Sequence, residues 1–463
     1  MDAIPILKAL NGYGPSAKDF NKFWTRNLGL EYKGVKYNVG PSPDDLVLNL
    51  VNEQEYVITP MWDVIGIING TLADEVIIVG NHRDAWIAGG AADPNSGSAA
   101  LNEVVRSFGE ALKLGWKPLR TIVFASWDGE EYGLVGSTEW VEEYLPWLSK
   151  ASVAYVNMDV ACSGPVFKVS ASPPLNNIIC EITGMVLSPN QTVKDQTVRD
   201  VWDGQISTMG SGSDFTAFQD HAGIPSIDMG FAGSTESPVY HYHSNYDSYH
   251  WMATYGDPGF HYHAAAAKIL ALFTAKLSET PVLPMNITDY ATALKSYVAQ
   301  VAAKLDPSQK EDTQAARFRP SRSGSKMSGD PASLIRIFKR LNRAVSNLHR
   351  QALKFDAYAA SLAEKAGEDI PWWKWISKLK LYYDIRKVNT KIKYFERNFL
   401  YEPGLDSRSW FKHVVFAPGL WTGYTGAVFP GLVEAIDEKD YKNAERWVLV
   451  IEGVLEKARD SLE

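Results

Sequence analysis

The sequence predicts an α/β protein with a mixed, mostly parallel sheet flanked by helices, joined to a C-terminal helical domain. Between about residues 55 and 275, short runs rich in Val, Ile and Phe alternate with helix-like segments, which is typical of a parallel sheet covered by helices. After residue 286 the pattern changes to long amphipathic helices. A chain of 463 residues also exceeds what one hydrophobic core usually serves, so we expect several domains.

Six runs in the first part of the chain have the length and composition of strands. They are residues 64–70, 75–81, 120–126, 152–158, 165–170 and 223–231. Helices are expected where apolar residues recur every three or four positions, at residues 95–114, 137–148 and 261–276. We therefore place an α/β domain at residues 51–285. Residues 1–50 hold a predicted helix at 16–28 but no complete domain, so we expect them to be the remnant of an upstream region.

The C-terminal part is predicted to be a helical domain covering residues 286–463. Its helices are expected at residues 289–305, 332–366, 372–400 and 440–462. Between the first two, residues 307–331 are rich in Ser, Gly and charge and offer almost nothing to bury. This segment is predicted to be a mobile loop.

The composition argues against several functions. A net charge of -8 and a pI near 5.7 give no basic surface for nucleic acid. No stretch approaches the ~20 apolar residues of a membrane span. Because the chain has only two cysteines, Cys162 and Cys180, a bound metal would be held by carboxylates and imidazoles rather than by a thiolate cluster.

The residues that could carry chemistry follow the predicted strands, at the edge where ligands bind in open α/β sheets. They are His82, Asp84, Asp93, Glu130, Glu131, Asp159 and His243. Taken alone, each of these residues is more often a solvated surface acid or a structural histidine than a ligand. Together, imidazoles and carboxylates suit zinc, which takes nitrogen and oxygen ligands at about 2 Å. Two ions ~3.5 to 4 Å apart need one shared ligand, and a carboxylate can offer an oxygen to each.

Six motifs along the chain resemble those of the glutamate carboxypeptidase II family. They are NHRDAW, DPNSG, FASWDGEEYGLVGSTEW, AYVNMD, GSGSDF and YHSNYDSY. The resemblance implies a zinc exopeptidase with two zinc ions per chain, bridged by Asp93. It implies that His82 and Asp159 complete one metal site and that Glu131 and His243 complete the other. It also makes Glu130 the general base, which fits a carboxylate beside the metals that accepts a proton from water.

Several roles around these ligands are expected on the same basis. Asp84 is predicted to accept the far ring N–H of His82 and so fix its tautomer. His241 competes with His243 as a ligand, and we choose His243 because the family motif continues after it. Ser213, Tyr242 and Tyr424 match positions that contact substrate.

The chain departs from the family where glutamate-selective members hold substrate carboxylates. The arginine positions fall on Val169, Asp228 and Gly230, and the lysine position falls on Gly423. Glutamate selectivity is therefore not expected, and Asp228 could instead pair with a free α-amino group. The family's apical domain is also missing from this sequence, so as a fragment the chain is expected to bind substrate poorly or to be inactive.

A calcium ion is a further expectation, because Glu139 and Glu142 match half of the family's calcium site. Solvated surface acids are the alternative.

The predicted function is hydrolysis of terminal peptide bonds in small peptides by a two-zinc exopeptidase that resembles glutamate carboxypeptidase but lacks its arginine pocket. Aminopeptidase or dipeptidase polarity is the alternative. A non-catalytic receptor or scaffold resembling the transferrin receptor is the alternative from another class. The resemblance implies a homodimer formed through the helical domain, with exposed aromatic candidates at Trp372, Trp373, Trp375, Tyr382 and Tyr383. It also implies an extracellular or vacuolar location, with a membrane anchor in the full-length protein.

Overall fold

The computed structural model describes residues 3–20, 29–304, 331–421 and 423–463, which fold as two units, 1–60 and 61–463. The first unit contains the helices α1 (Ala3–Ala9) and α2 (Ala17–Phe20) and the short 3₁₀ helix η1 (Glu31–Lys33). The helix predicted at residues 16–28 is described only as far as Phe20, since residues 21–28 lie outside the described part.

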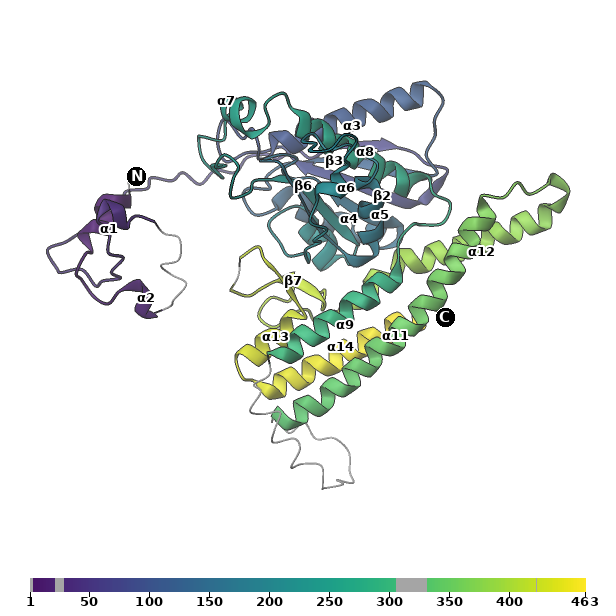
Figure 1. The fold of residues 1–463 in the computed structure, drawn as a ribbon. Coiled ribbons are helices and arrows are strands. Elements are labelled where there is room, and N and C mark those ends of the chain that lie inside the picture. Colours follow the sequence, from purple (N-terminus) through teal and green to yellow (C-terminus); the bar gives the residue numbers. More distant parts are fainter. Residues whose placement is uncertain (1–2, 21–28, 305–330, 422) are drawn as a thin grey trace. The chain divides into compact units, whose positions relative to one another are not determined.

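The second unit is built on a six-stranded sheet with the order β1-β3-β2-β4-β6-β5 (Figure 1). Its strands are β1 (Val64–Ile68), β2 (Leu72–His82), β3 (Arg120–Trp127), β4 (Ser152–Asn157), β5 (Val166–Ala171) and β6 (Ser226–Ala232). The four central strands are parallel, whereas the edge strands β1 and β5 run antiparallel to their neighbours. The predicted fold class is confirmed, and each of the six predicted runs overlaps one of these strands.

Helices cover both faces of this sheet because side chains alternate along each strand. On β2, Ile77 and Val79 join the core on the side of α3 (Asn95–Lys113) and α8 (His261–Glu279). Val76 and Ile78 point to the opposite face, where they pack in the core with α4 (Val135–Ala151). Shorter elements complete the layers: η2 (Pro173–Leu175), α5 (Asn176–Thr183), α6 (Val198–Val201), η3 (Ala217–His221), α7 (Tyr249–Trp251) and η4 (Met252–Gly256).

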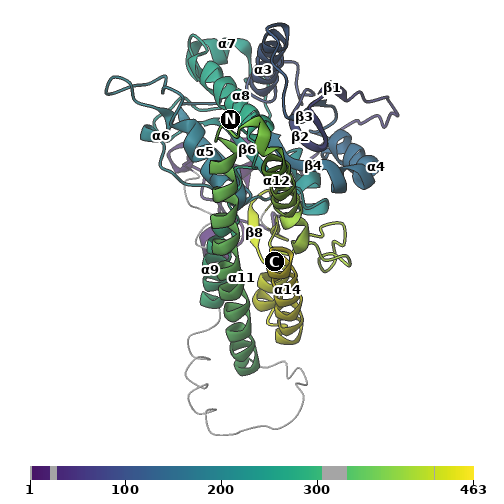
Figure 2. The same ribbon diagram turned by 90° about the vertical axis from the view of Figure 1, so that its right-hand side faces the viewer.

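The C-terminal helices pack against one another below the sheet in the view of Figure 1. The helices α9 (Ile287–Ala303), α11 (Pro331–Ala366) and α14 (Tyr441–Ser461) run side by side in both views (Figures 1 and 2). Between α11 and α14 the chain forms η6 (Trp372–Lys374), α12 (Trp375–Phe395), η7 (Glu396–Phe399), β7 (Phe416–Pro418), β8 (Gly426–Val428) and α13 (Pro430–Asp437). Of the predicted loop at 307–331, residues up to 330 lie outside the described part and Pro331 begins α11.

A buried carboxylate joins the sheet layer to the helices. Glu396 accepts hydrogen bonds from Ser172 Oγ (2.7 Å) and Gln219 Nε2 (2.8 Å) of the α/β region. It also accepts bonds from Tyr290 OH (3.0 Å) and pairs with His413 Nε2 (3.0 Å) in the helical region. We call these five residues the Glu396 cluster. Because all five are buried, the cluster fixes the two regions to each other.

Among the described helices, none has the length and apolar character needed to span a membrane.

Candidate metal centre

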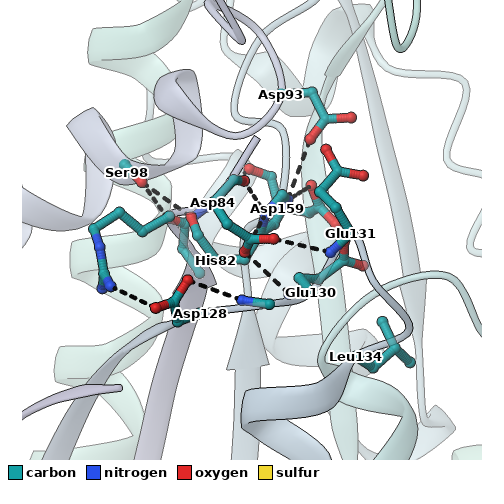
Figure 3. Close-up of polar contacts among 12 residues, drawn as sticks. His82, Asp84, Asp93, Ser98, Asp128, Glu130, Glu131, Leu134 and Asp159 are labelled. Atoms are coloured by element: carbon teal, nitrogen blue, oxygen red, sulfur yellow. Dashed lines mark hydrogen bonds and ion pairs between the residues drawn. The ribbon is translucent and has the colours of Figure 1, made fainter. Parts of the chain in front are cut away.

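The carboxyl ends of three neighbouring strands bring acids and imidazoles together (Figure 3). His82 is the last residue of β2, Glu130 and Glu131 follow β3, and Asp159 follows β4. Parallel strands end at the same edge of the sheet, so these side chains meet although they are far apart in sequence. The loop after β2 adds Asp93. We call this assembly, with His243 from the loop after β6, the acidic centre.

Two groups of side chains in the acidic centre have the geometry of metal ligands. In the first, His82 Nε2 lies 2.9 Å from Asp159 Oδ1 and 3.2 Å from Asp93 Oδ1. In the second, His243 Nε2 lies 3.1 Å from Glu131 Oε2 and 3.3 Å from Asp93 Oδ2. Within each group the ligand atoms lie within 4.8 Å of one another. Asp93 belongs to both groups and presents a different oxygen to each.

The protonation of His82 indicates why a cation fits the first group. Its Nδ1 lies 2.9 Å from the main-chain carbonyl of Asp84, which can only accept, so Nδ1 carries a proton. In the neutral ring Nε2 would then hold a lone pair facing two carboxylate oxygens. Burial alone would lower the pKa of His82, but the charge of Asp159 and the surrounding hydrogen bonds raise it strongly. A second ring proton or a metal ion would each relieve this clash, and the ligand atoms are those that zinc prefers.

The acids themselves are short of partners. Glu131 Oε1 is buried with no hydrogen-bond partner, while Oε2 faces His243. Burial and the charge of Asp93 raise the pKa of Glu131 to about 7. Burial and the charge of Asp159 raise the pKa of Glu130 to about 9. Negative charge is thus crowded in a place with little water to screen it, and a divalent cation would offset that repulsion.

Glu130 is set apart from the ligand groups. It is buried and belongs to neither of the two groups, yet its side chain lines the same cavity as Asp93, Glu131 and Asp159. A carboxylate that stands beside metal ligands without joining them is free to exchange a proton with a molecule in the cavity.

Asp84 differs in detail from its predicted role. Its carboxylate accepts the backbone N–H groups of Glu130 (3.0 Å) and Glu131 (3.1 Å). The near partner of His82 Nδ1 is the main-chain carbonyl of Asp84, whereas the carboxylate oxygen lies 3.6 Å away. Asp84 therefore positions His82 mainly through its backbone carbonyl. Its side chain positions the turn that carries Glu130 and Glu131.

Asp247 supports the centre in a way that the sequence analysis missed. Its carboxylate accepts the N–H groups of Ala92 (2.8 Å) and Asp93 (3.1 Å) and the hydroxyl of Tyr240 (3.2 Å). It thereby ties the loop that carries His243 to the loop that carries Asp93. The signal was present in the sequence, because Asp247 lies inside the quoted YHSNYDSY motif.

Gly97 explains one glycine of the DPNSG motif. It lies in the first turn of α3, and a Cβ at this position would come within 2.1 Å of the Asp159 carbonyl oxygen. A side chain here would push the end of β4 away from the helix. The glycine is thus needed for Asp159 to approach Asp93.

A cavity of about 900 Å³ opens over the acidic centre. Its walls include several aromatic rings, and they come from both the α/β and the helical regions. The aromatic lining residues are Trp86, Tyr242, His243, Trp410, Phe411 and Tyr424. Trp410 and Phe411 were not predicted, since nothing in their local sequence marks a segment so far along the chain as part of the site.

The predicted substrate residues lie around this cavity and a second one of about 650 Å³ beside it. Tyr242 and Tyr424 line both, and the Tyr242 ring stacks on His243 with centroids 3.6 Å apart. Ser213 lines the second cavity but is buried, where its Oγ accepts a hydrogen bond from Asn157 (2.9 Å).

Asp228 also lines the second cavity, with Val169 and Gly230, the other two positions where the family carries arginines. Its carboxylate accepts a hydrogen bond from Asn157 (2.9 Å), and burial together with the charge of Asp159 raises its pKa to about 7. Gly423 is not among the lining residues of either cavity.

Three other predicted positions lie outside the ligand groups. His241 is exposed, and of the two neighbouring histidines it is His243 that approaches the carboxylates. Glu139 is exposed, and Glu142 accepts a hydrogen bond from the Trp410 indole (2.6 Å). Neither glutamate belongs to a metal-ligand group in the part of the chain that the structure describes, so calcium there stays a prediction.

Comparison with known families defines the class of protein. Residues 63–256 match Peptidase family M28, and residues 337–463 match the transferrin receptor-like dimerisation domain. The chain therefore combines an M28 peptidase domain with a transferrin receptor-like dimerisation domain. The two matches fall within the predicted domains at 51–285 and 286–463.

Curated relatives agree with this class. A "Probable glutamate carboxypeptidase" of Arthroderma benhamiae is 41% identical and is matched over 99% of this chain and 59% of its own length. "Probable glutamate carboxypeptidase LAMP1" of Arabidopsis thaliana is 36% identical, over 96% of this chain and 58% of its own length. "Aminopeptidase NAALADL1" of Mus musculus is 32% identical, over 97% of this chain and 57% of its own length. The chain thus spans less than two thirds of these relatives, and the predicted resemblance to the glutamate carboxypeptidase II family is confirmed.

Proposed function

We propose that this chain carries the centre of a two-zinc exopeptidase that hydrolyses terminal peptide bonds of small peptides. The observation that supports it most is the position of Asp93, whose two carboxylate oxygens face two separate His-carboxylate groups. A single carboxylate shared in this way is what a pair of neighbouring ions requires.

The proposed ligands follow the two groups. His82 and Asp159 would hold one ion, Glu131 and His243 would hold the other, and Asp93 would be shared by both. When bound, the ions would polarise the peptide carbonyl and make a water molecule more acidic. Asp84 and Asp247 keep the ligand-bearing loops in position through their bonds to backbone N–H groups.

Glu130 is proposed as the general base. Its carboxylate takes the proton of the attacking water and later delivers it to the nitrogen of the leaving amine. Its position favours this role, because Glu130 lines the cavity and belongs to neither ligand group, so its carboxylate is free to take up a proton and to release it.

The polarity of the exopeptidase is proposed from the second cavity. Carboxypeptidase action needs a cation near the substrate's terminal carboxylate, and Lys168, which lines this cavity, already pairs with Asp203 at 3.2 Å. Asp228 places a carboxylate in the same cavity, where it could pair with a free α-amino group. We therefore favour an aminopeptidase or dipeptidase and keep a carboxypeptidase without the arginine pocket as the second candidate.

Metal analysis tests the first part of the proposal. Elemental analysis of protein dialysed against zinc should give two equivalents per chain, and peptide hydrolysis should disappear with a chelator and return with zinc. Fewer than two equivalents, together with no peptide hydrolysis, would favour a non-catalytic receptor or scaffold.

Blocked dipeptides test the polarity. An aminopeptidase cleaves substrates whose N-terminus is free and whose C-terminus is amidated, and it spares N-acetylated ones. Cleavage only of substrates with a free C-terminus would sink the aminopeptidase assignment and leave the metal assignment intact.

A homodimer is proposed from the match of residues 337–463 to a dimerisation domain. Light scattering at micromolar concentration should give twice the chain mass of 51.4 kDa. A monomer under these conditions would contradict the assignment.

A further inference from the structure

The residues that line the cavity over the acidic centre fall into two chemical classes. Its acids all belong to the acidic centre itself: Asp93, Glu130, Glu131 and Asp159. Large apolar side chains line much of the rest, and we call them the apolar wall: Trp86, Ile87, Leu134, Trp410 and Phe411. Among the described residues that line this cavity, none is Lys or Arg. Away from the acidic centre, the cavity therefore offers a ligand mainly rings and aliphatic groups.

The part of the apolar wall that comes from the helical region is held in place by the α/β region. The Trp410 indole N–H donates to Glu142 of α4 (2.6 Å), and its ring stacks on His221 of η3 with centroids 4.8 Å apart. The Trp410 carbonyl also lies 2.8 Å from His221 Nδ1. Phe411 packs edge-on against Trp410 with centroids 5.0 Å apart. The two rings thus form a surface that a ligand does not have to order before it binds.

The position of Glu130 indicates which part of a substrate enters this cavity, a step that rests on the proposed function. As the general base, Glu130 returns its proton to the leaving amine, so that amine must face Glu130. Glu130 lines the first cavity and not the second, whereas Asp228 lines the second and not the first. Asp93 and Asp159 line both. A peptide whose α-amino group pairs with Asp228 therefore crosses the acidic centre and places its leaving residue in the first cavity.

The chemistry of the cavity limits which leaving residue fits. An acidic side chain would lose water without gaining a Lys or Arg partner, and a basic one would find only acids that serve the metal centre. An apolar side chain, above all an aromatic ring, would exchange water for contact with the apolar wall. We infer that this cavity selects peptides whose leaving residue is aromatic or large and aliphatic, and that Trp410 and Phe411 determine this specificity.

A dipeptide series tests the inference on the unaltered, zinc-loaded 463-residue chain. The N-terminal residue is kept as Ala, and the leaving residue is Phe, Leu, Gly, Glu or Arg. Ala-Phe and Ala-Leu should have kcat/KM values about tenfold or more above those of the other three, because only their side chains gain from burial against the apolar wall. Equal values, or fastest cleavage of Ala-Glu or Ala-Arg, would overturn the inference and leave the proposed exopeptidase intact.

A variant tests the assignment of the wall. Trp410→Ala should lower the ratio of kcat/KM for Ala-Phe to that for Ala-Gly by about tenfold, whereas the ratio for Phe-Gly to Ala-Gly should stay constant. A merely structural role would lower all three substrates together. Trp421→Ala is the matched control, because its indole is 88% exposed and does not line this cavity.

Phe411→Ala repeats the variant test, and circular dichroism checks that each variant is folded. If the folded variants kept the preference for Ala-Phe, Trp410 and Phe411 would not determine the specificity.

Calorimetry separates this inference from the proposed activity. The leaving amino acid is also a product, so L-phenylalanine should bind the zinc-loaded chain about tenfold or more tightly than L-glutamate or glycine. If no peptide were cleaved but L-phenylalanine bound with this preference, the chemistry of the cavity would stand and the exopeptidase would be wrong. If no peptide were cleaved and L-phenylalanine bound no better than glycine, both would be wrong.

Discussion

The acidic centre and the Glu396 cluster surround their carboxylates with opposite kinds of partner. Glu396 is the one acid of its cluster, and the other four side chains direct donor atoms at it, although burial and the charge of Glu396 together raise the pKa of the buried Asp220. In the acidic centre, carboxylates face one another, and one oxygen of Glu131 has no partner. Burial and neighbouring charge raise the pKa of Glu130 to about 9, which reflects this crowding.

The contrast separates what holds the fold from what serves function. A buried charge that is surrounded by donors stabilises a structure, whereas buried like charges oppose it unless a ligand compensates. The Glu396 cluster is complete with the chain alone. The acidic centre needs added protons or bound cations to offset its repulsion, so we expect changes there to affect metal binding and activity, and changes at Glu396 to affect stability.

The largest expected effect is at the shared ligand. Asp93→Ala removes the oxygens that face both His82 and His243, so both zinc ions should be lost or strongly weakened, and peptidase activity should fall by about 10⁴-fold or more. Elemental analysis and a peptide assay measure the two outcomes. Glu236→Ala, an exposed acid elsewhere, is the control. If the Asp93→Ala variant kept two equivalents of zinc, Asp93 would not be a shared ligand, and the proposed role of the acidic centre in holding cations would be wrong.

A smaller but more specific effect is expected at the general base. Glu130→Gln should lower kcat/KM by roughly 10³-fold while zinc content stays at the level of the parent protein. Glu131→Gln is the matched variant next to it, and it should lose zinc as well as activity because Glu131 belongs to a ligand group. If both variants lost zinc equally, the distinction between base and ligand would be wrong.

The sequence predicted the elements of the sheet well because strand composition and helical spacing are local signals. Each predicted strand at the edge of the centre was found, and His82, Asp93, Glu131, Asp159 and His243 do meet in two groups. The grouping of Asp93 with both histidines could be anticipated only from motifs, since spacing along the chain does not reveal distance.

What the sequence did not reveal depends on contacts between distant segments. Asp247 supports Asp93 from 154 positions away, and Trp410 closes a cavity formed mainly by the α/β region. The Glu396 cluster was missed for the same reason, because a glutamate in a helical pattern is normally a surface residue. The α13 helix and the β7–β8 pair were missed because their segments are short.

The contrast between the acidic centre and the Glu396 cluster also predicts an effect on stability at Glu396. Glu396→Gln replaces an acceptor oxygen with a donor amide among four donors, so the free energy of unfolding should fall by about 3 kcal/mol. Urea denaturation measures it. Tyr290→Phe removes one donor and leaves the carboxylate with the others, so it should cost only about 1 kcal/mol. Zinc content should be unchanged in both, and a loss of zinc would mean that the two regions are coupled.

The smallest expected effect concerns Asp84, a half-buried acid. It combines features of both regions, since it lies beside the ligands and yet its oxygens have donors. Asp84→Asn keeps one acceptor for the backbone N–H groups of Glu130 and Glu131 but turns an amide group toward the other. The turn should loosen, and zinc affinity should weaken by about 10- to 100-fold in a competition titration with a chelator. Asp247→Asn is the matched variant, because it disturbs a backbone N–H contact at Asp93 instead. If either variant lowered the free energy of unfolding while leaving zinc affinity unchanged, that aspartate would be a structural acid like Glu396. Its hydrogen bonds would then stabilise the fold without positioning the metal ligands.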